Sequence, residues 1–111
     1  MIPAELEARI LELGHIKAAA RAKAFLLEKE LKSTYGEAYA RIRDIDGKTQ
    51  GDAQQMAYAA KDYREAVKRA HDALHESEVA RVNYDALYAR FEAWRSLNAS
   101  QREQIKQGVY Q

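Results

Sequence analysis

Apolar side chains recur every three or four residues through most of this chain, and the longest such stretch contains neither proline nor glycine. It extends from Asp52 to Ser100. The spacing is that of one face of an α-helix, and a helix over 53–97 would be roughly 65 Å long at a rise of about 1.5 Å per residue. A compact core built from 111 residues is only about 25 to 30 Å across. We therefore expect this helix to pack lengthwise against other helices.

The apolar positions of the long helix form two runs. They are Met56, Ala60, Tyr63, Val67, Ala70, Leu74 and Ser77, followed by Ala80, Tyr84, Leu87, Phe91 and Trp94. The additional three-residue step between Ser77 and Ala80 predicts a stammer, a discontinuity that locally tightens a supercoil. Small side chains dominate the first run and large aromatic ones the second. We expect a helix with a thin half and a bulky half.

A first helix is predicted over 3–32. Pro3 suits its first turn because a helix leaves that N–H unpaired in any case, and Glu5 and Glu7 complement the positive end of the helix dipole. Its apolar stripe consists of Leu6, Ile10, Leu13, then Ile16 or Ala20, Ala24, Leu27 and Leu31. This spacing fits a coiled-coil seam. The alanines in its middle would let two helices approach closely.

Capping signals divide the segment between these two helices. Thr34 followed three residues later by Glu37 resembles a capping box. It predicts a break around Ser33–Gly36, then a short helix over about 37–44. A connecting loop is expected over 46–51, where aspartate and glycine residues favour turns.

Two further capping signals mark the second half of the chain. Asp52, with Gln55 three positions later, is the predicted N-cap of the long helix. Ser100 followed by Glu103 predicts a separate short helix over 101–107.

These elements predict an all-α fold of one domain, residues 1–111. Its main feature would be a long antiparallel helical hairpin, coiled-coil-like, with short extra helices. A hairpin of two helices leaves part of each apolar stripe in water. We therefore expect a homodimer in which two hairpins form a four-helix arrangement.

Composition narrows the classes of function. The chain has no cysteine, which excludes disulfides, thiol catalysis and cysteine-ligated zinc. Its formal net charge of +1 creates no long-range field that would attract nucleic acid or membrane. No apolar run reaches the about 20 residues of a membrane span, and the first residues lack a signal-peptide pattern. We expect a cytoplasmic protein that is not an enzyme and carries no cofactor.

His71 and His75 are the weak candidates for a metal site. They are four residues apart on one helix face, the spacing at which two imidazoles can bind one ion. Asp72 occupies the place of the glutamate in a zinc protease motif but is one methylene shorter. No third histidine lies near them in the sequence. We interpret both residues as solvent-exposed and expect no metal site.

Basic residues without acidic neighbours are candidates for nucleic-acid contact. One acid-free segment lies between Leu13 and Leu27, and a second acid-poor zone lies around Trp94. The candidates are Lys17, Arg21, Lys23, Arg95, Arg102 and Lys106. Phosphate contacts from cations beside a stacking aromatic are typical of single-strand binding. We expect Lys17 and Arg21 to lie off the apolar seam, where they could reach a phosphate backbone.

Large aromatic side chains are concentrated in the second half of the long helix. They cannot all fit one narrow seam, so part of their area should be buried against another chain. The candidates for this self-association or partner interface are Tyr84, Leu87, Tyr88, Phe91 and Trp94.

Two segments, residues 22–26 and 87–100, resemble a group of small alanine-rich helical proteins of tailed phages and prophages. These proteins are often encoded near recombination and replication genes. The resemblance implies a non-enzymatic accessory protein in the cytoplasm of a bacterial host. We expect it to dock to a protein partner, either DNA-processing machinery or a host defence factor. The alternatives are a nucleic-acid-binding accessory of a recombination module and a virion assembly or scaffold component.

Overall fold

The protein is helical in all its regular structure over residues 3–108, the part of the chain that the computed structural model describes. Helix α1 spans Pro3–Asp44, α2 spans Gln50–Ala59 and α3 spans Lys61–Lys106, and no strand occurs within the described residues. The predicted all-α class is confirmed. Within the same residues, none of the helices carries an apolar stretch sufficient to cross a membrane.

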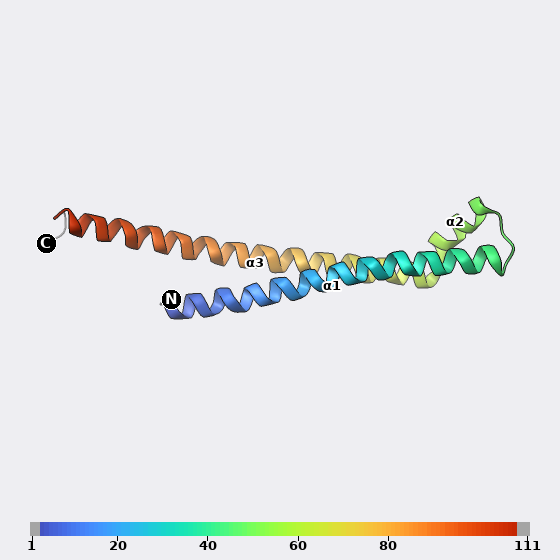
Figure 1. Cartoon of the computed structure of the whole chain (residues 1–111), viewed down its shortest axis with the longest axis horizontal. Coiled ribbons are helices and arrows are strands. Elements are labelled where there is room, and N and C mark those ends of the chain that lie inside the picture. The colour runs from blue at the N-terminus through green and yellow to red at the C-terminus, as the bar shows by residue number, and fades with distance from the viewer. Residues whose placement is uncertain (1–2, 109–111) are drawn as a thin grey trace. The chain divides into compact units, whose positions relative to one another are not determined.

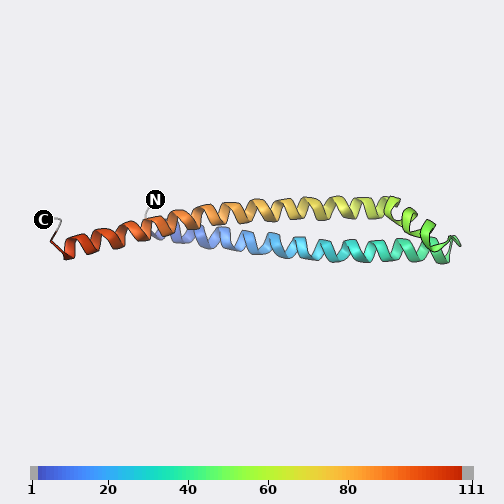
Figure 2. The ribbon, with the colours of Figure 1, turned by 90° about the horizontal axis from the view of Figure 1, so that it is seen from above.

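The chain divides into two compact units, each built from one segment of α1 and one of α3. The loop unit comprises Ala18–Val79 and contains α2; the terminal unit comprises the residues up to Lys17 together with those from Ala80 onward. In each unit the two segments lie side by side and run in opposite directions (Figure 1 and Figure 2). The predicted antiparallel helical hairpin is confirmed within each unit.

Short side chains form the core of the loop unit, where α2 packs on α1. The buried residues are Ala38, Ile42, Ala53 and Ala57, with Tyr35, Tyr39 and Ala60 packed against them. All three alanines of this cluster have no exposed surface. Because a methyl group adds little bulk, α2 can approach α1 closely, and the backbone itself becomes part of the contact.

The connection between α1 and α2 is a tight turn over residues 45–49. Gly47 adopts a positive φ of 67°, a conformation that costs glycine little. Thr49, and not the predicted Asp52, is the N-cap of α2. Its Oγ1 accepts a hydrogen bond from the N–H of Asp52 at 3.4 Å. The helix starts earlier than expected because the threonine hydroxyl satisfies one of the free N–H groups of the first turn.

The long helix predicted over 53–97 is interrupted at Ala60, which has extended backbone angles of φ −62° and ψ 138°. The N–H of Ala60 donates to the carbonyl of Ala57 at 3.2 Å, and its carbonyl accepts from the N–H of Arg64 at 2.9 Å. One residue therefore ends α2 and begins α3. No proline or glycine marks this position. The break has a tertiary cause, because it lets α2 turn its alanines onto α1.

The break predicted around Ser33–Gly36 is absent, and α1 continues to Asp44. Gly36 is exposed and helical, with no atom of another segment within 4 Å of a Cβ built there. A glycine inside a helix costs about 1 kcal/mol relative to alanine. Packing of Ala38 and Ile42 in the core offsets this cost, and the separate helix over 37–44 becomes the last turns of α1.

The separate C-terminal helix predicted over 101–107 is also absent, because α3 runs through Ser100 without interruption to Lys106. Gly108, with a φ of 78°, follows the helix, and its N–H donates to the carbonyl of Ile105 at 3.0 Å. A positive-φ glycine after the last turn is a common helix terminator.

The apolar seam of α3 differs from the predicted one in its first half. Ala66 and Ala73 are each 2% exposed, whereas Val67 and Leu74 are 40% and 56% exposed. With Ala66 and Ala73 in the seam, its positions alternate in steps of three and four from Tyr63 to Asn98. The predicted stammer between Ser77 and Ala80 is therefore wrong. The prediction followed the larger side chains, but the close helix contact selects the smaller ones.

A lysine occupies a seam position in α1. Half-buried Lys17 lies between Leu13 and Ala20 in the alternating spacing, while Ile16 is 47% exposed. The expectation that Lys17 lies off the seam is wrong. The seam of α1 follows the regular three-and-four spacing through this position regardless of which side chain is most apolar.

We predict that Leu87→Ala lowers the free energy of unfolding by about 2 to 4 kcal/mol, because it removes a buried side chain from a seam that cannot collapse around the gap. Leu87 is 8% exposed. The matched control is Leu74→Ala, which alters a side chain that is 56% exposed and should cost less than about 1 kcal/mol. Urea unfolding followed by circular dichroism compares the two. Equal losses would contradict the observed seam.

Candidate functional site

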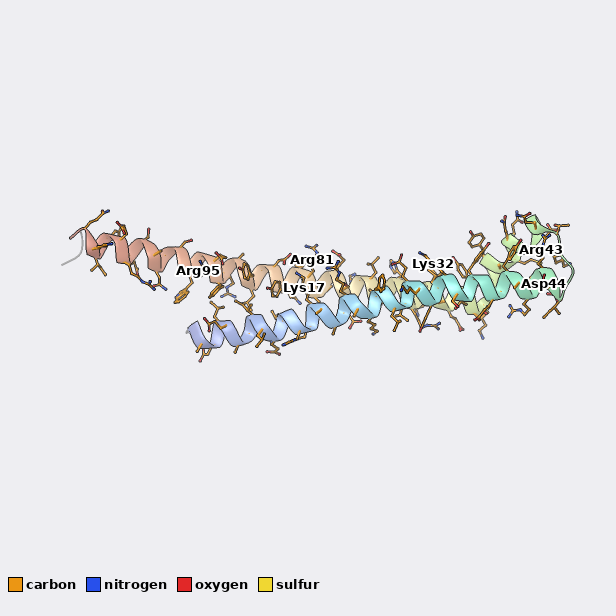
Figure 3. All side chains as sticks on the ribbon, viewed as in Figure 1. Lys17, Lys32, Arg43, Asp44, Arg81 and Arg95 are labelled. Carbon is orange, nitrogen blue, oxygen red and sulfur yellow. The ribbon has the colours of Figure 1, made fainter. Side chains whose placement is uncertain are left out.

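Lys17 makes two contacts across the terminal unit. Its Nζ lies 3.8 Å from Oδ1 of Asp85 and 4.5 Å from the centroid of the Tyr84 ring. In Figure 3 the labelled Lys17 lies where α1 and α3 meet. A cation held over an aromatic face beside a carboxylate is satisfied within the fold. It is a poor candidate for contact with a phosphate backbone.

The surroundings of Lys17 are shaped to hold the Tyr84 ring. A Cβ built on Gly14 would lie 3.4 Å from Cε2 of Tyr84, so a longer side chain pointing the same way would meet the ring. Asp85 also accepts a hydrogen bond from Arg81 at 3.2 Å. The contacts of Lys17 with the Tyr84 ring and with Asp85 join α1 to α3 in this unit. A single lysine in a coiled-coil seam is a known register determinant.

The remaining basic candidates divide into paired and unpaired side chains. Lys23 lies 3.3 Å from Oε2 of Glu76, and Arg95 lies 3.3 Å from Oε1 of Glu92. Arg21, Arg102 and Lys106 are exposed. Within the described residues these last three have no acidic partner within ion-pair distance.

The nucleic-acid candidates are divided between the two units. Lys17 and Lys23 belong to different units, and each faces a carboxylate of α3. Local neutralisation removes much of the charge that phosphate contacts would need.

Most residues of the predicted aromatic interface lie at seam positions of α3. Leu87 is buried and Tyr84, Phe91 and Trp94 are half-buried, whereas Tyr88 is 42% exposed. Ring centroids along α3 are 6.0 Å apart from Tyr84 to Tyr88, 6.1 Å from Tyr88 to Phe91 and 6.2 Å from Phe91 to Trp94. The rings are therefore only partly covered within the hairpin, and Tyr88 remains exposed.

A second aromatic cluster, which the sequence reasoning missed, lies in the loop unit. The Tyr35 ring centroid is 4.8 Å from that of Tyr58, 5.6 Å from that of Tyr63 and 6.3 Å from that of Tyr39. Tyr58 and Tyr63 are also 5.6 Å apart. These rings come from all three helices, so sequence spacing could not bring them together. These mutual ring contacts join the three helices in the loop unit.

The metal candidates remain separate surface residues. His71 and His75 are exposed on α3, and no group of three or more side chains suited to hold a metal ion occurs within residues 3–108.

Among the described residues, most buried apolar side chains are small, and many larger ones are exposed, which is the reverse of an ordinary core. Seven of the ten buried apolar residues among those described are alanines. Fourteen large apolar side chains in the same part of the chain are exposed: Leu11, Ile16, Phe25, Leu26, Ile45, Met56, Tyr58, Val67, Leu74, Val79, Val82, Tyr88, Leu97 and Ile105. Single exposed apolar residues are normal on a protein surface, but an alanine core beneath so many larger ones is not.

In comparisons with known proteins, no family model, curated protein or solved structure matches the chain.

We predict that alkaline pH destabilises the loop unit through Tyr35. Burial, followed by a hydrogen bond with Tyr58 and the neighbouring phenols, raises the pKa of Tyr35 above its ordinary 10.0. The contribution of its neutral form to stability is fully present below that ordinary pKa. It is lost as the pH rises through the higher pKa of the folded state.

Tyr35→Phe keeps the ring and removes the titrating group. Its unfolding free energy should therefore fall less between pH 9 and pH 11, roughly the window around an ordinary tyrosine pKa, than that of the unaltered protein. Denaturant titrations across this range measure the difference. Tyr88→Phe, in the other unit, is the control, and identical slopes for the Tyr35→Phe variant and the unaltered protein would refute the assignment.

Proposed function

We propose that this protein acts by docking to another protein through its exposed apolar helix faces, as a non-enzymatic accessory protein. Its inverted apolar distribution supports the proposal. Seven of the ten buried apolar residues among those described are alanines, while larger side chains such as Leu74 and Phe25 are 56% and 59% exposed. Burying one methyl group contributes about 0.8 kcal/mol, against about 1.5 to 3 kcal/mol for a whole leucine or phenylalanine side chain. A partner that covers the outer residues would thus add more apolar burial than the alanine contacts do.

The setting of this role is also a proposal. The resemblance to small helical phage and prophage proteins suggests the cytoplasm of a bacterial host. The partner would then belong to DNA-processing machinery or be a host defence factor. A scaffold role in virion assembly would need higher oligomers of the chain, and no feature of the described residues favours it. Direct nucleic-acid binding is disfavoured because Lys17, Lys23 and Arg95 already have acidic neighbours.

We propose a homodimer as the free state of the protein. Tyr88 supports this, since it is exposed among otherwise half-buried aromatic residues of α3. A dimer contact through this part of α3 would cover its ring together with the edges of Phe91 and Trp94.

We predict a dimer mass by light scattering at micromolar concentration. Tyr88→Glu should reduce it to the monomer mass with helix content unchanged, because burying an unpaired carboxylate in an apolar contact is unfavourable. Val79→Glu, at a residue that is 46% exposed in the other unit, should leave the dimer intact. A monomer mass for the unaltered protein would refute the dimer.

We also predict that docking can be captured by a photo-crosslinking residue placed at Leu74. It should give one discrete crosslinked protein in cells that naturally encode this chain. The same residue placed at exposed Gln54 should not. Crosslinking identifies neighbours directly, without requiring the complex to survive purification.

Two results would overturn the docking function. One is the absence of any protein crosslink from exposed apolar positions on both units. The other is submicromolar binding to a labelled oligonucleotide that weakens steeply with salt, with a slope of about −0.7 per phosphate contact for a single strand. That second result would make the protein a nucleic-acid-binding accessory.

A further inference from the structure

The segment of α1 around Ala22 is apolar on two opposite faces. Its inner face contains Ala20, which is 7% exposed, and the half-buried residues Ala24 and Leu27. Its outer face, which we call the α1 outer face, consists of the exposed residues Ala18, Ala19, Ala22, Phe25 and Leu26. An apolar stripe on a helix normally packs against another element. Here α3 covers only one side.

The α1 outer face has the shape of a helix-packing surface. Its members are spaced three, four and seven residues apart, so they form two adjacent rows along one side of the helix. Three of the five are alanines, which permit the close approach of another helix at the short end of the usual 8–10 Å range. Phe25 and Leu26, each 59% exposed, stand at one end of this smooth surface and would anchor the partner.

The rim of the α1 outer face is basic. Arg21 lies beside it without an acidic partner among the described residues, and Nζ of Lys29 lies 4.6 Å from the centroid of the Phe25 ring. Lys23 is held by Glu76 on the opposite flank. No acidic residue occurs from Leu13 to Leu27, and the exposed residues Glu28 and Glu30 follow beyond the Phe25 end of the face. An apolar strip with a cationic rim is complementary to a helix with an apolar strip and an acidic rim.

A second copy of this chain is a poor occupant for the same surface. A two-fold contact centred near Ala22 would place Arg21 of one copy near Arg21 of the other, and juxtaposed like charges oppose association. A lipid surface is also a poor fit, because membrane-bound helices insert large apolar side chains. The α1 outer face offers only Phe25 and Leu26.

We propose that the α1 outer face binds an amphipathic helix of a partner protein that has small or aliphatic residues along its apolar strip and glutamate or aspartate along both flanks. This inference rests on the docking function proposed above and assigns it a surface and a partner chemistry. The partner helix would lie along α1, with its apolar side chains over Ala22 and its carboxylates beside Arg21 and Lys29.

The test uses two fluorescein-labelled helical peptides of about three heptads each, with alanine and leucine on the apolar strip. One has glutamate at all flanking positions and the other has lysine. Fluorescence anisotropy with the full chain should show binding of the glutamate peptide at least about tenfold tighter than the lysine peptide at low salt, a difference that decreases as salt screens the charges. Equal affinity for the two peptides, or no binding of either, would overturn the proposal.

Substitutions locate the site and its charge. Ala22→Arg blocks close approach and should weaken binding of the glutamate peptide about tenfold or more. Ala93→Arg, at an exposed alanine of α3 in the other unit, should not change it. Arg is a good helix former, and circular dichroism checks that both variants remain folded. Leu26→Gln provides a second variant that removes an anchor without adding charge.

The double variant Arg21→Glu with Lys29→Glu should reverse the preference and bind the lysine peptide more tightly. Ala22→Arg binding as well as the unaltered protein would overturn the proposal. The proposal would also be overturned if Ala22→Arg lost the dimer mass while Ala93→Arg kept it. That result would show that a second copy of the chain covers the α1 outer face. Binding to phosphatidylglycerol vesicles that is stronger than peptide binding and is lost in Leu26→Gln would assign the face to lipid instead.

The crosslink from Leu74 separates this inference from the docking function itself. If Ala22→Arg leaves that crosslink unchanged, docking stands and the α1 outer face is the wrong surface. If neither Leu74 nor Phe25 carrying the photoreactive residue crosslinks to a protein, the docking function fails together with this inference.

Discussion

Close contact between helices through alanine is the constraint on which the rest of this structure depends. Ala66 and Ala73 of α3 are almost fully buried, and three alanines with no exposed surface lie between α1 and α2. Contacts of this kind gain dispersion energy from backbone atoms but exclude large side chains. Fourteen larger apolar side chains among the described residues lie exposed on the outside of the helices. The protein therefore exposes much apolar side-chain area, because its core consists mostly of small side chains.

Alanine side chains are uniform and small, so an alanine seam does little to fix the register between two helices. Other side chains must set that register. In the terminal unit this role falls to Lys17, which contacts the Tyr84 ring and Asp85 across the two helices. In the loop unit the Tyr35 cluster has the comparable role, because its rings come from α1, α2 and α3. The Lys17 contacts and the Tyr35 cluster each favour one alignment of the helices, whereas the alanine contacts alone would fit several.

The small side chains of α1 also link the fold to the proposed function. A helix that uses alanines on both faces can pack closely with α3 on one side and with a partner on the other. The charges then decide which partner fits, because apolar contact alone discriminates poorly between helices. The acid-free composition around Arg21 is therefore better explained as the rim of a protein contact than as a phosphate-binding patch, since Lys17 and Lys23 on the same segment are paired within the fold.

Periodicity and composition by themselves determined that the chain is all-α, that its two long helices are antiparallel, and that a tight turn near Gly47 ends the first of them. These features follow from local spacing and backbone chemistry. Tertiary structure alone decided the break at Ala60, the continuity through Gly36, and the choice of Ala66 and Ala73 over Val67 and Leu74 for the seam. In each case contact with another helix outweighed a local preference of about 1 kcal/mol or less, and the residue that makes that contact is distant in the sequence.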